Sequence, residues 1–193
     1  MGSKARIMTA RIMAAFAIIG TLASATAGES KADDDRKSID CTETDLHFTG
    51  DGFKVTCSEL KSQQLQQSDG SAQIRVEMLT ASTTDDRNWL IALDFRILGS
   101  LAIRRMGLED DVHSHFTTLP TKNWKSTDDV GGFEAAEFES VNESRDIYDC
   151  VAFQQFMNRR YNGFSRWVVG VSCSTKGVET ARQTLTGFGG PGG

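Results

Sequence analysis

Five side chains that can bind a metal lie within seven residues of this 193-residue chain: Glu109, Asp110, Asp111, His113 and His115. Imidazole and carboxylate ligands together suit zinc or copper. In a strand, His113 and His115 would point the same way, whereas residues two apart on a helix diverge. The segment is therefore a candidate metal site built from Asp110, Asp111, His113 and His115. The alternative is a solvated acidic loop or helix end.

A second candidate surrounds an Asn-Gly pair, where arginine and aromatic side chains gather: Arg159, Arg160, Tyr161, Arg166 and Trp167. Arginine beside aromatic rings can hold an anionic or planar ligand through charge-assisted hydrogen bonds and stacking. The alternative is a hairpin whose exposed end carries solubilising arginines that protect an edge from pairing. Both interpretations predict a hairpin, because Asn-Gly is a strong signal for a two-residue turn.

Sequence motifs of the common catalytic sites are absent. The chain has no G-x-S-x-G elbow, no Walker loop and no G-x-G-x-x-G. Its adjacent carboxylates, such as Asp85 with Asp86, point apart on strands and helices and so are not acid–base pairs by spacing. An enzyme remains possible only if Asp, Glu and His residues converge in space, for instance in a small hydrolase.

The four cysteines are Cys41, Cys57, Cys150 and Cys173. In an exported chain, four cysteines favour disulfides over metal ligands or a nucleophile. Three pairings are possible, and we favour 41–57 with 150–173, because each pair flanks a turn signal. A two-residue turn at residues 162–163 would place Cys173 opposite Ala152, a diagonal neighbour of Cys150, so this bridge would require a different loop or a bulge.

Residues 1–27 have the pattern of a signal peptide: three basic residues, an apolar run over 12–23, and the small residues 25-ATA-27 before a cleavage site near Ala27–Gly28. The apolar run is short for a membrane span, which requires about 20 residues. We therefore expect export, to the periplasm of a bacterium or beyond it, and no stable membrane insertion after cleavage.

The chain from residue 28 onward is acidic. It carries 18 Lys plus Arg against 26 Asp plus Glu, a net charge of −8. This charge disfavours nucleic-acid binding, which depends on neutralising phosphates. We expect no cofactor, and as partner an unidentified protein or a small anionic ligand.

Period-two alternation predicts strands in the middle of the chain. Residues 72–80 should form a strand with one solvated face carrying Gln73, Arg75 and Glu77. Residues 89–98 form the strongest predicted strand, near the centre of the sheet. Further strands are predicted at 45–60 as a hairpin, at 133–141 and on both sides of the Asn-Gly turn. Residues 61–71 are polar and predict a loop or a short exposed helix.

Helical spacing appears near the C-terminus, where Val178, Ala181, Leu185 and Phe188 form one apolar stripe. Residues 99–116 are ambiguous, with a helix that could begin at Ser100. Together these elements predict an α+β fold: a mostly antiparallel sheet with the C-terminal helix, and a possible second one, packed on one face. An all-β sandwich is the alternative.

The predicted organisation is a signal peptide (1–27), a disordered leader (28–40), a single exported domain (41–188) and a flexible Gly-rich tail (189–193). The favoured function is that of an exported, non-enzymatic binding or accessory protein stabilised by two disulfides. The alternatives are a small exported hydrolase and a metal-handling protein that uses residues 109–115.

Overall fold

A computed structural model describes residues 36–67, 70–142 and 145–190 of the chain. The predicted signal peptide, the first part of the leader and the end of the tail lie outside these residues. The strands are β1 (Arg36–Ile39), β2 (His47–Phe48), β3 (Phe53–Gln67), β4 (Gly70–Thr83), β5 (Asn88–Leu98), β6 (Lys122–Val130), β7 (Phe133–Val141), β8 (Ile147–Arg160), β9 (Gly163–Ser174) and β10 (Phe188–Gly189). The helices are η2 (Cys41–Glu43, one 3₁₀ turn), α1 (Leu108–His115) and α2 (Val178–Thr186).

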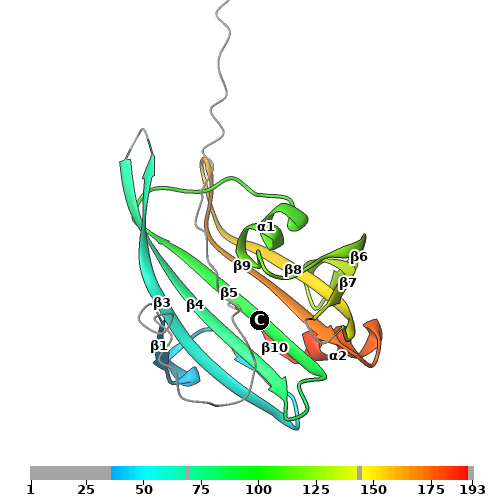
Figure 1. The fold of residues 1–193 in the computed structure, drawn as a ribbon. Coiled ribbons are helices and arrows are strands. Elements are labelled where there is room, and N and C mark those ends of the chain that lie inside the picture. Colours follow the sequence, from blue (N-terminus) through cyan, green and yellow to red (C-terminus); the bar gives the residue numbers. More distant parts are fainter. Residues whose placement is uncertain (1–35, 68–69, 143–144, 191–193) are drawn as a thin grey trace, which may run out of the picture.

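Eight strands form one antiparallel sheet in the order β1-β3-β4-β5-β9-β8-β7-β6. The strands β3, β4 and β5 follow one another as a meander. The chain then passes through α1 to the far edge, where β6 begins a second meander that returns through β7 and β8 to β9 (Figure 1). Pairing of β5 with β9 joins the two meanders, so the predicted central position of β5 is confirmed.

Alternation along β5 separates two faces of the sheet. Leu93, Phe95 and Ile97 belong to one buried cluster, whereas Leu90 and Ala92 belong to another. We call these the α1 face and the α2 face, after the helix that packs on each. The sheet is therefore buried on both sides in its central part, which explains why its strands are long and rich in apolar residues.

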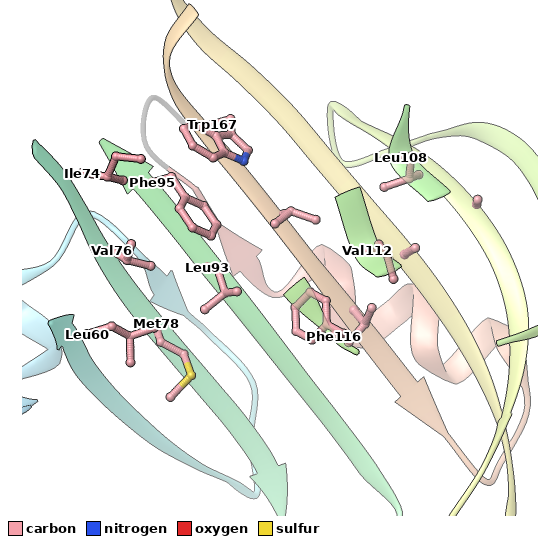
Figure 2. Close-up of a cluster of buried hydrophobic side chains, with 14 of the residues drawn as sticks. Leu60, Ile74, Val76, Met78, Leu93, Phe95, Leu108, Val112, Phe116 and Trp167 are labelled. Atoms are coloured by element: carbon pink, nitrogen blue, oxygen red, sulfur yellow. The ribbon is translucent and has the colours of Figure 1, made fainter. Parts of the chain in front are cut away.

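The α1 face carries the larger cluster (Figure 2). Leu108, Val112 and Phe116, spaced for one side of a helix, bring α1 and the residue after it down onto β7, β8 and β9. On the sheet, the Phe95 and Trp167 rings stack with their centroids 4.4 Å apart across β5 and β9. This stack lies over the junction of the two meanders.

The α2 face is covered by the predicted C-terminal helix. Ala181 and Leu185 of α2 are fully buried among Leu90, Val151 and Val168 of the central strands. The prediction of a mostly antiparallel sheet with an amphipathic C-terminal helix is confirmed. The expectation that a second helix would share its face is wrong, because α1 packs on the opposite side.

Three segments differ from their predicted structure. Residues 61–67, expected to be a loop or helix, continue β3 because their backbone pairs with β4 beyond an irregularity after Leu60. β2 pairs with β10 and not with β3, so the predicted 45–60 hairpin does not form. Residues 36–39, in the segment predicted to be a disordered leader, form the edge strand β1.

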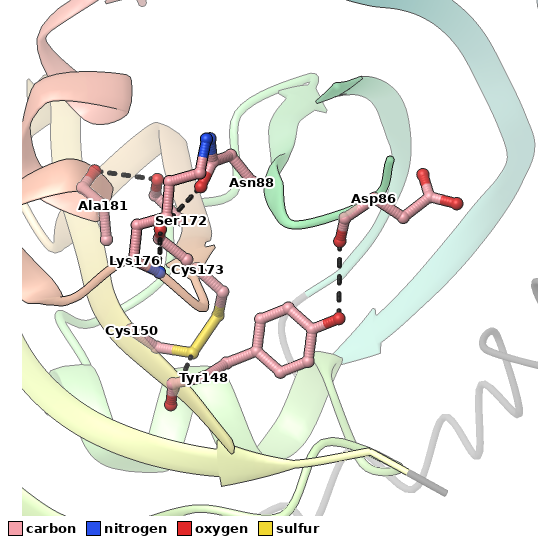
Figure 3. Close-up of a disulfide and its surroundings, with 9 residues drawn as sticks. Asp86, Asn88, Tyr148, Cys150, Ser172, Cys173, Lys176 and Ala181 are labelled. Carbon is pink, nitrogen blue, oxygen red and sulfur yellow. Dashed lines mark hydrogen bonds between the residues drawn. A yellow bond between two sulfur atoms is a disulfide. The ribbon is translucent and has the colours of Figure 1, made fainter. Parts of the chain in front are cut away.

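Both favoured disulfides are present, Cys41–Cys57 and Cys150–Cys173. The second joins residues that lie directly opposite each other on β8 and β9 (Figure 3). The turn consists of Tyr161 and Asn162, with Arg160 paired to Gly163, so the predicted turn at 162–163 is wrong by one residue. The corrected turn removes the diagonal offset, and the bridge needs no bulge.

No helix in the described part of the chain has the length and apolar character that crossing a bilayer requires. The two disulfides are typical of proteins in an oxidising compartment.

Candidate ligand-binding groove

The arginine and aromatic residues predicted to form a ligand surface are separated by the β8–β9 hairpin. Tyr161 lies at the turn and is fully exposed. Trp167 is 4% exposed and points into the α1 face, where it stacks on Phe95. Its neighbour Arg166 points to the opposite face. Adjacent residues of a strand cannot share a face, so these side chains do not form one surface.

Arg166 is held by Asp94, whose side chain is completely buried on the α2 face. The guanidinium donates from Nε to Asp94 Oδ1 (3.0 Å) and from Nη2 to Asp94 Oδ2 (2.6 Å). Arg96 also donates from Nε to Asp94 Oδ2, at 2.9 Å. Asp94 therefore accepts hydrogen bonds from two arginines that lie directly opposite each other on β5 and β9.

The same network extends to both sides of Asp94. Arg96 Nη2 lies 2.8 Å from Glu77 Oε2, and Asp45 Oδ2 lies 2.8 Å from Arg166 Nη2. The hydrogen bond from Arg166 holds the pKa of Asp45 below its usual value, against the opposing effect of burial. Glu77 is 1% exposed, so the predicted solvated face of 72–80 is wrong at this residue. Arg166 is thus engaged in an internal ion network.

At the end of the hairpin, Arg160 donates hydrogen bonds to the backbone carbonyls of Gly99 and Leu101. It fixes the connection that follows β5. Arg159 is exposed beside it. The residues predicted to bind an anion therefore lie in different environments. Tyr161 lies at the turn, Trp167 in the buried stack and Arg166 in the ion network, while Arg160 holds the loop after β5.

The four predicted metal ligands lie on α1 and also diverge. Asp111 is fully buried, and its Oδ1 lies 3.2 Å from Nε2 of His115, one turn later. His113 faces outward and its Nε2 lies 2.6 Å from the hydroxyl of Thr121. Asp110 is exposed. No three His, Cys, Asp or Glu side chains of the described residues come close enough together to hold a metal.

The structure instead shows a hollow of about 360 Å³ between the start of α1 and the edge of the sheet formed by β6 and β7. We call it the α1–β6 groove. It is lined by Gly107, Leu108, Glu109, Asp110, Trp124, Ser126, Thr127, Glu134, Ala135 and Ala136. A smaller hollow of about 210 Å³ lies near β2 and α2, and its described lining carries no charged side chain.

Local sequence explains the shape of the groove. Gly107 precedes the first turn of α1, and Leu108 is buried beneath the helix. The small side chain of Ala136, which points to the α1 face of β7, keeps the floor of the groove low. Trp124 forms one wall, half-buried, with its ring stacked on Phe138 at 5.3 Å between centroids. These elements leave a space that a larger side chain on β7 would fill.

Glu134 is held in place at the groove by two partners. Gln154, which is 1% exposed, donates from Nε2 to Glu134 Oε2 at 2.7 Å, and Arg105 forms an ion pair with the same oxygen. Burial raises the pKa of Glu134, but the hydrogen bonds from Arg105 and Gln154 outweigh it and hold the pKa below its usual value. The Glu134 carboxylate is therefore ionised at neutral pH.

The chemistry that this groove offers is recognition. It combines an aromatic wall, three carboxylates and the hydroxyl of Ser126, whereas the hydroxyl of Thr127 accepts a hydrogen bond from Arg182 of α2. Its described lining has no histidine or lysine that could activate either hydroxyl. Glu134, the most buried of the carboxylates, is already paired with Arg105.

Sequence reasoning missed most of this site. Glu109 and Asp110 were singled out, but as metal ligands. Trp124 lay outside the predicted strands and helices, and Glu134 lay in the predicted strand 133–141 without an assigned role. The available signal was Ala136, a small residue on the α1 face of a strand whose next residue on that face is Phe138.

No family model, no curated protein and no solved structure matches this chain in the comparisons with known proteins.

Proposed function

We propose that the chain is an exported, periplasmic, non-enzymatic binding protein that takes a small ligand in the α1–β6 groove. The observation that carries the proposal is the composition of the groove: Trp124 lines a hollow that carboxylates of α1 and β7 and the hydroxyl of Ser126 on β6 also line. Binding sites typically combine an aromatic wall with a few placed polar groups.

Binding is favoured over hydrolysis by the state of the polar groups. Glu134 is an ion-paired carboxylate, so it cannot accept a proton readily, and the described lining supplies no imidazole. The Asp111–His115 pair lies on the buried side of α1, where Phe95 packs against the imidazole ring at 4.5 Å.

Export is supported by the disulfides and by the signal-like pattern of residues 1–27. Two bridges in one domain favour an oxidising compartment. The periplasm is the compartment that this combination favours in a bacterium.

The test blocks the groove without disturbing the core. Ser126 is exposed on the edge strand β6, so Ser126→Trp should fill the hollow, whereas Lys125→Trp adds the same side chain at a residue outside the lining. Both proteins and the wild type would be incubated with small-molecule extract of the compartment and analysed by native mass spectrometry. We expect a bound mass on the wild type and on Lys125→Trp, and none on Ser126→Trp. The same bound mass on all three would reject the groove.

A further inference from the structure

The ligand class follows from the charge of the α1–β6 groove, an inference that rests on the proposed function. Glu109, Asp110 and Glu134 contribute three negative charges, and Arg105 contributes one positive charge through its ion pair. The start of α1 adds about half a positive charge from the helix dipole. The groove therefore keeps a net charge of about −1.5 by this count, which favours a cation.

The Trp124 ring adds a second attraction for a cation. A tryptophan face attracts ammonium and guanidinium groups more strongly than other aromatic side chains do. The ring is fixed by its stack on Phe138, so little entropy is lost when a ligand packs on it. A bare metal ion would gain less from this wall, because hard cations require several oxygen ligands at short range.

The chain itself provides an example of the contact. The guanidinium of Arg105 pairs with Glu134 and lies 6.0 Å from the centre of the Phe156 ring. An organic cation thus already lies between a carboxylate of the groove lining and an aromatic ring. The Oε1 atom of Gln154, next to Glu134, is buried without a hydrogen-bond partner among the described residues.

We propose that the groove binds a small organic cation bearing an ammonium or guanidinium group, with Trp124 against the cation, Glu109 and Asp110 as counter-charges, and Glu134 shared with Arg105. In this arrangement Arg105 competes with the ligand for Glu134. Loss of Arg105 should therefore tighten cation binding, a result that a purely structural ion pair would not produce.

The experiment is calorimetric titration of the disulfide-bonded protein with defined probes. Choline and agmatine are the cations, 3,3-dimethylbutan-1-ol is the neutral isostere of choline, and acetate is the anion. We expect both cations to bind at least tenfold more tightly than the isostere, with an affinity that falls as salt is raised. Equal affinity for choline and its isostere would overturn the inference.

Substitutions in the α1–β6 groove test whether the cations bind there. The double substitution Glu109→Gln with Asp110→Asn should weaken cation binding at least tenfold, and Trp124→Leu at least threefold. The control Asp128→Asn with Asp129→Asn removes two carboxylates of β6 that do not line the groove, and should leave affinity unchanged. Arg105→Ala should bind the cations several-fold more tightly. Thermal unfolding of each variant confirms that it is folded.

The outcomes separate this inference from the function on which it rests. If neutral or anionic compounds bind, and Ser126→Trp blocks them, the groove is a binding site but its ligand is not a cation. If cations bind equally to the wild type and to Ser126→Trp, both the groove and the cation assignment fail. If the two double variants behave alike, the carboxylates of the groove do not select the ligand and the inference is wrong.

Discussion

At the scale of single residues, Asp94 is a buried charge at the junction of β5 and β9. It is completely buried, and its oxygens accept hydrogen bonds from Arg96 on the same strand and from Arg166 on the neighbouring strand β9. A buried carboxylate is stable only when its partners compensate for lost hydration. Asp94 thus links β5 to β9 through ion pairs. It lies at the end of the β5–β9 junction where charged side chains take the place of apolar ones.

Replacement of Asp94 with Asn keeps the volume but removes the charge of the buried carboxylate that pairs with both Arg96 and Arg166. We expect the free energy of unfolding to fall by about 3–5 kcal/mol. Urea denaturation followed by circular dichroism measures it. The comparison is Asp45→Asn, where the lost carboxylate is 55% exposed and the cost should stay below about 1 kcal/mol. Equal losses for the two variants would contradict the conclusion that burial makes the ion pairs of Asp94 more important for stability than those of Asp45.

The pKa of Asp45 gives a pH-dependent prediction. Its folded-state pKa is lowered mainly by the hydrogen bond from Arg166, so its stabilising effect is present above the unfolded pKa and is lost as pH falls through the folded value. The wild type should therefore lose stability relative to Asp45→Asn as the pH falls below about 4. Denaturant midpoints at a series of pH values would show the two curves converging in acid. A difference independent of pH would exclude the ion pair as its source.

Gly163 is required by two separate constraints. Its φ is +149°, and a Cβ atom there would lie 2.0 Å from the carbonyl oxygen of Ile103, which pairs with Phe164. Gly52 has a φ of +78° but open space around it. We expect Gly163→Ala to cost clearly more than Gly52→Ala, for which about 1 kcal/mol of strain is typical. Thermal unfolding of both variants measures the difference, and equal costs would mean that the loop moves away freely.

At the scale of elements, period-two alternation predicted β5 and β7 closely, and an apolar helical stripe predicted α2. Alternation works in β5 and β7 because each face of these strands packs its own set of side chains into one of the two cores. It failed at residues 61–67, where polar residues extend β3 through backbone pairing alone, and at β2, whose partner β10 lies about 140 residues away. Pairing between distant segments leaves no local pattern in the sequence.

Prediction of the candidate groove from the sequence fails for the same reason, because its residues come from segments that are distant in the chain. Both disulfide pairs could be predicted, because proximity in sequence and turn signals indicated them. The groove depends on where α1 crosses the sheet relative to β6, and residues 99–116 do not specify that path. Trp124 and Glu134 become neighbours of one hollow only after the crossover places β6 at the far edge.

The Cys41–Cys57 bridge should act on one element. β1 pairs only with β3, three of its four residues are exposed, and the bridge begins two residues after it ends. Replacing both cysteines with serine should therefore raise hydrogen exchange in β1 strongly. Exchange in β8 and β9, stapled by the other bridge, should change little. Uniformly faster exchange throughout the sheet would instead mean that this bridge stabilises the whole domain.

At the scale of the whole molecule, the sheet consists of two meanders that meet only at β5 and β9. Each contains one disulfide, and neither bridge crosses the junction. Packing does cross it: Phe95 stacks on Trp167 on the α1 face, while Leu90 and Val168 share the cluster beneath α2. The integrity of the domain therefore depends on its two cores and not on its covalent links.

Reduction of both disulfides should accordingly lower stability without dividing the molecule. The chain-entropy model assigns about 3 kcal/mol to each bridge, so reduced protein should unfold at a much lower urea concentration, still in one transition. Phe95→Ala, which opens the junction, should cost about 3–5 kcal/mol while both bridges remain intact. Tryptophan fluorescence reports on both meanders, since Trp89 lies on β5 and Trp124 and Trp167 lie on β6 and β9. Fluorescence and far-ultraviolet circular dichroism should give coincident curves for oxidised, reduced and Phe95→Ala protein. Two separate transitions in the oxidised wild type would show that the meanders are independent units, because only a weak junction would let one unfold while the other stays folded.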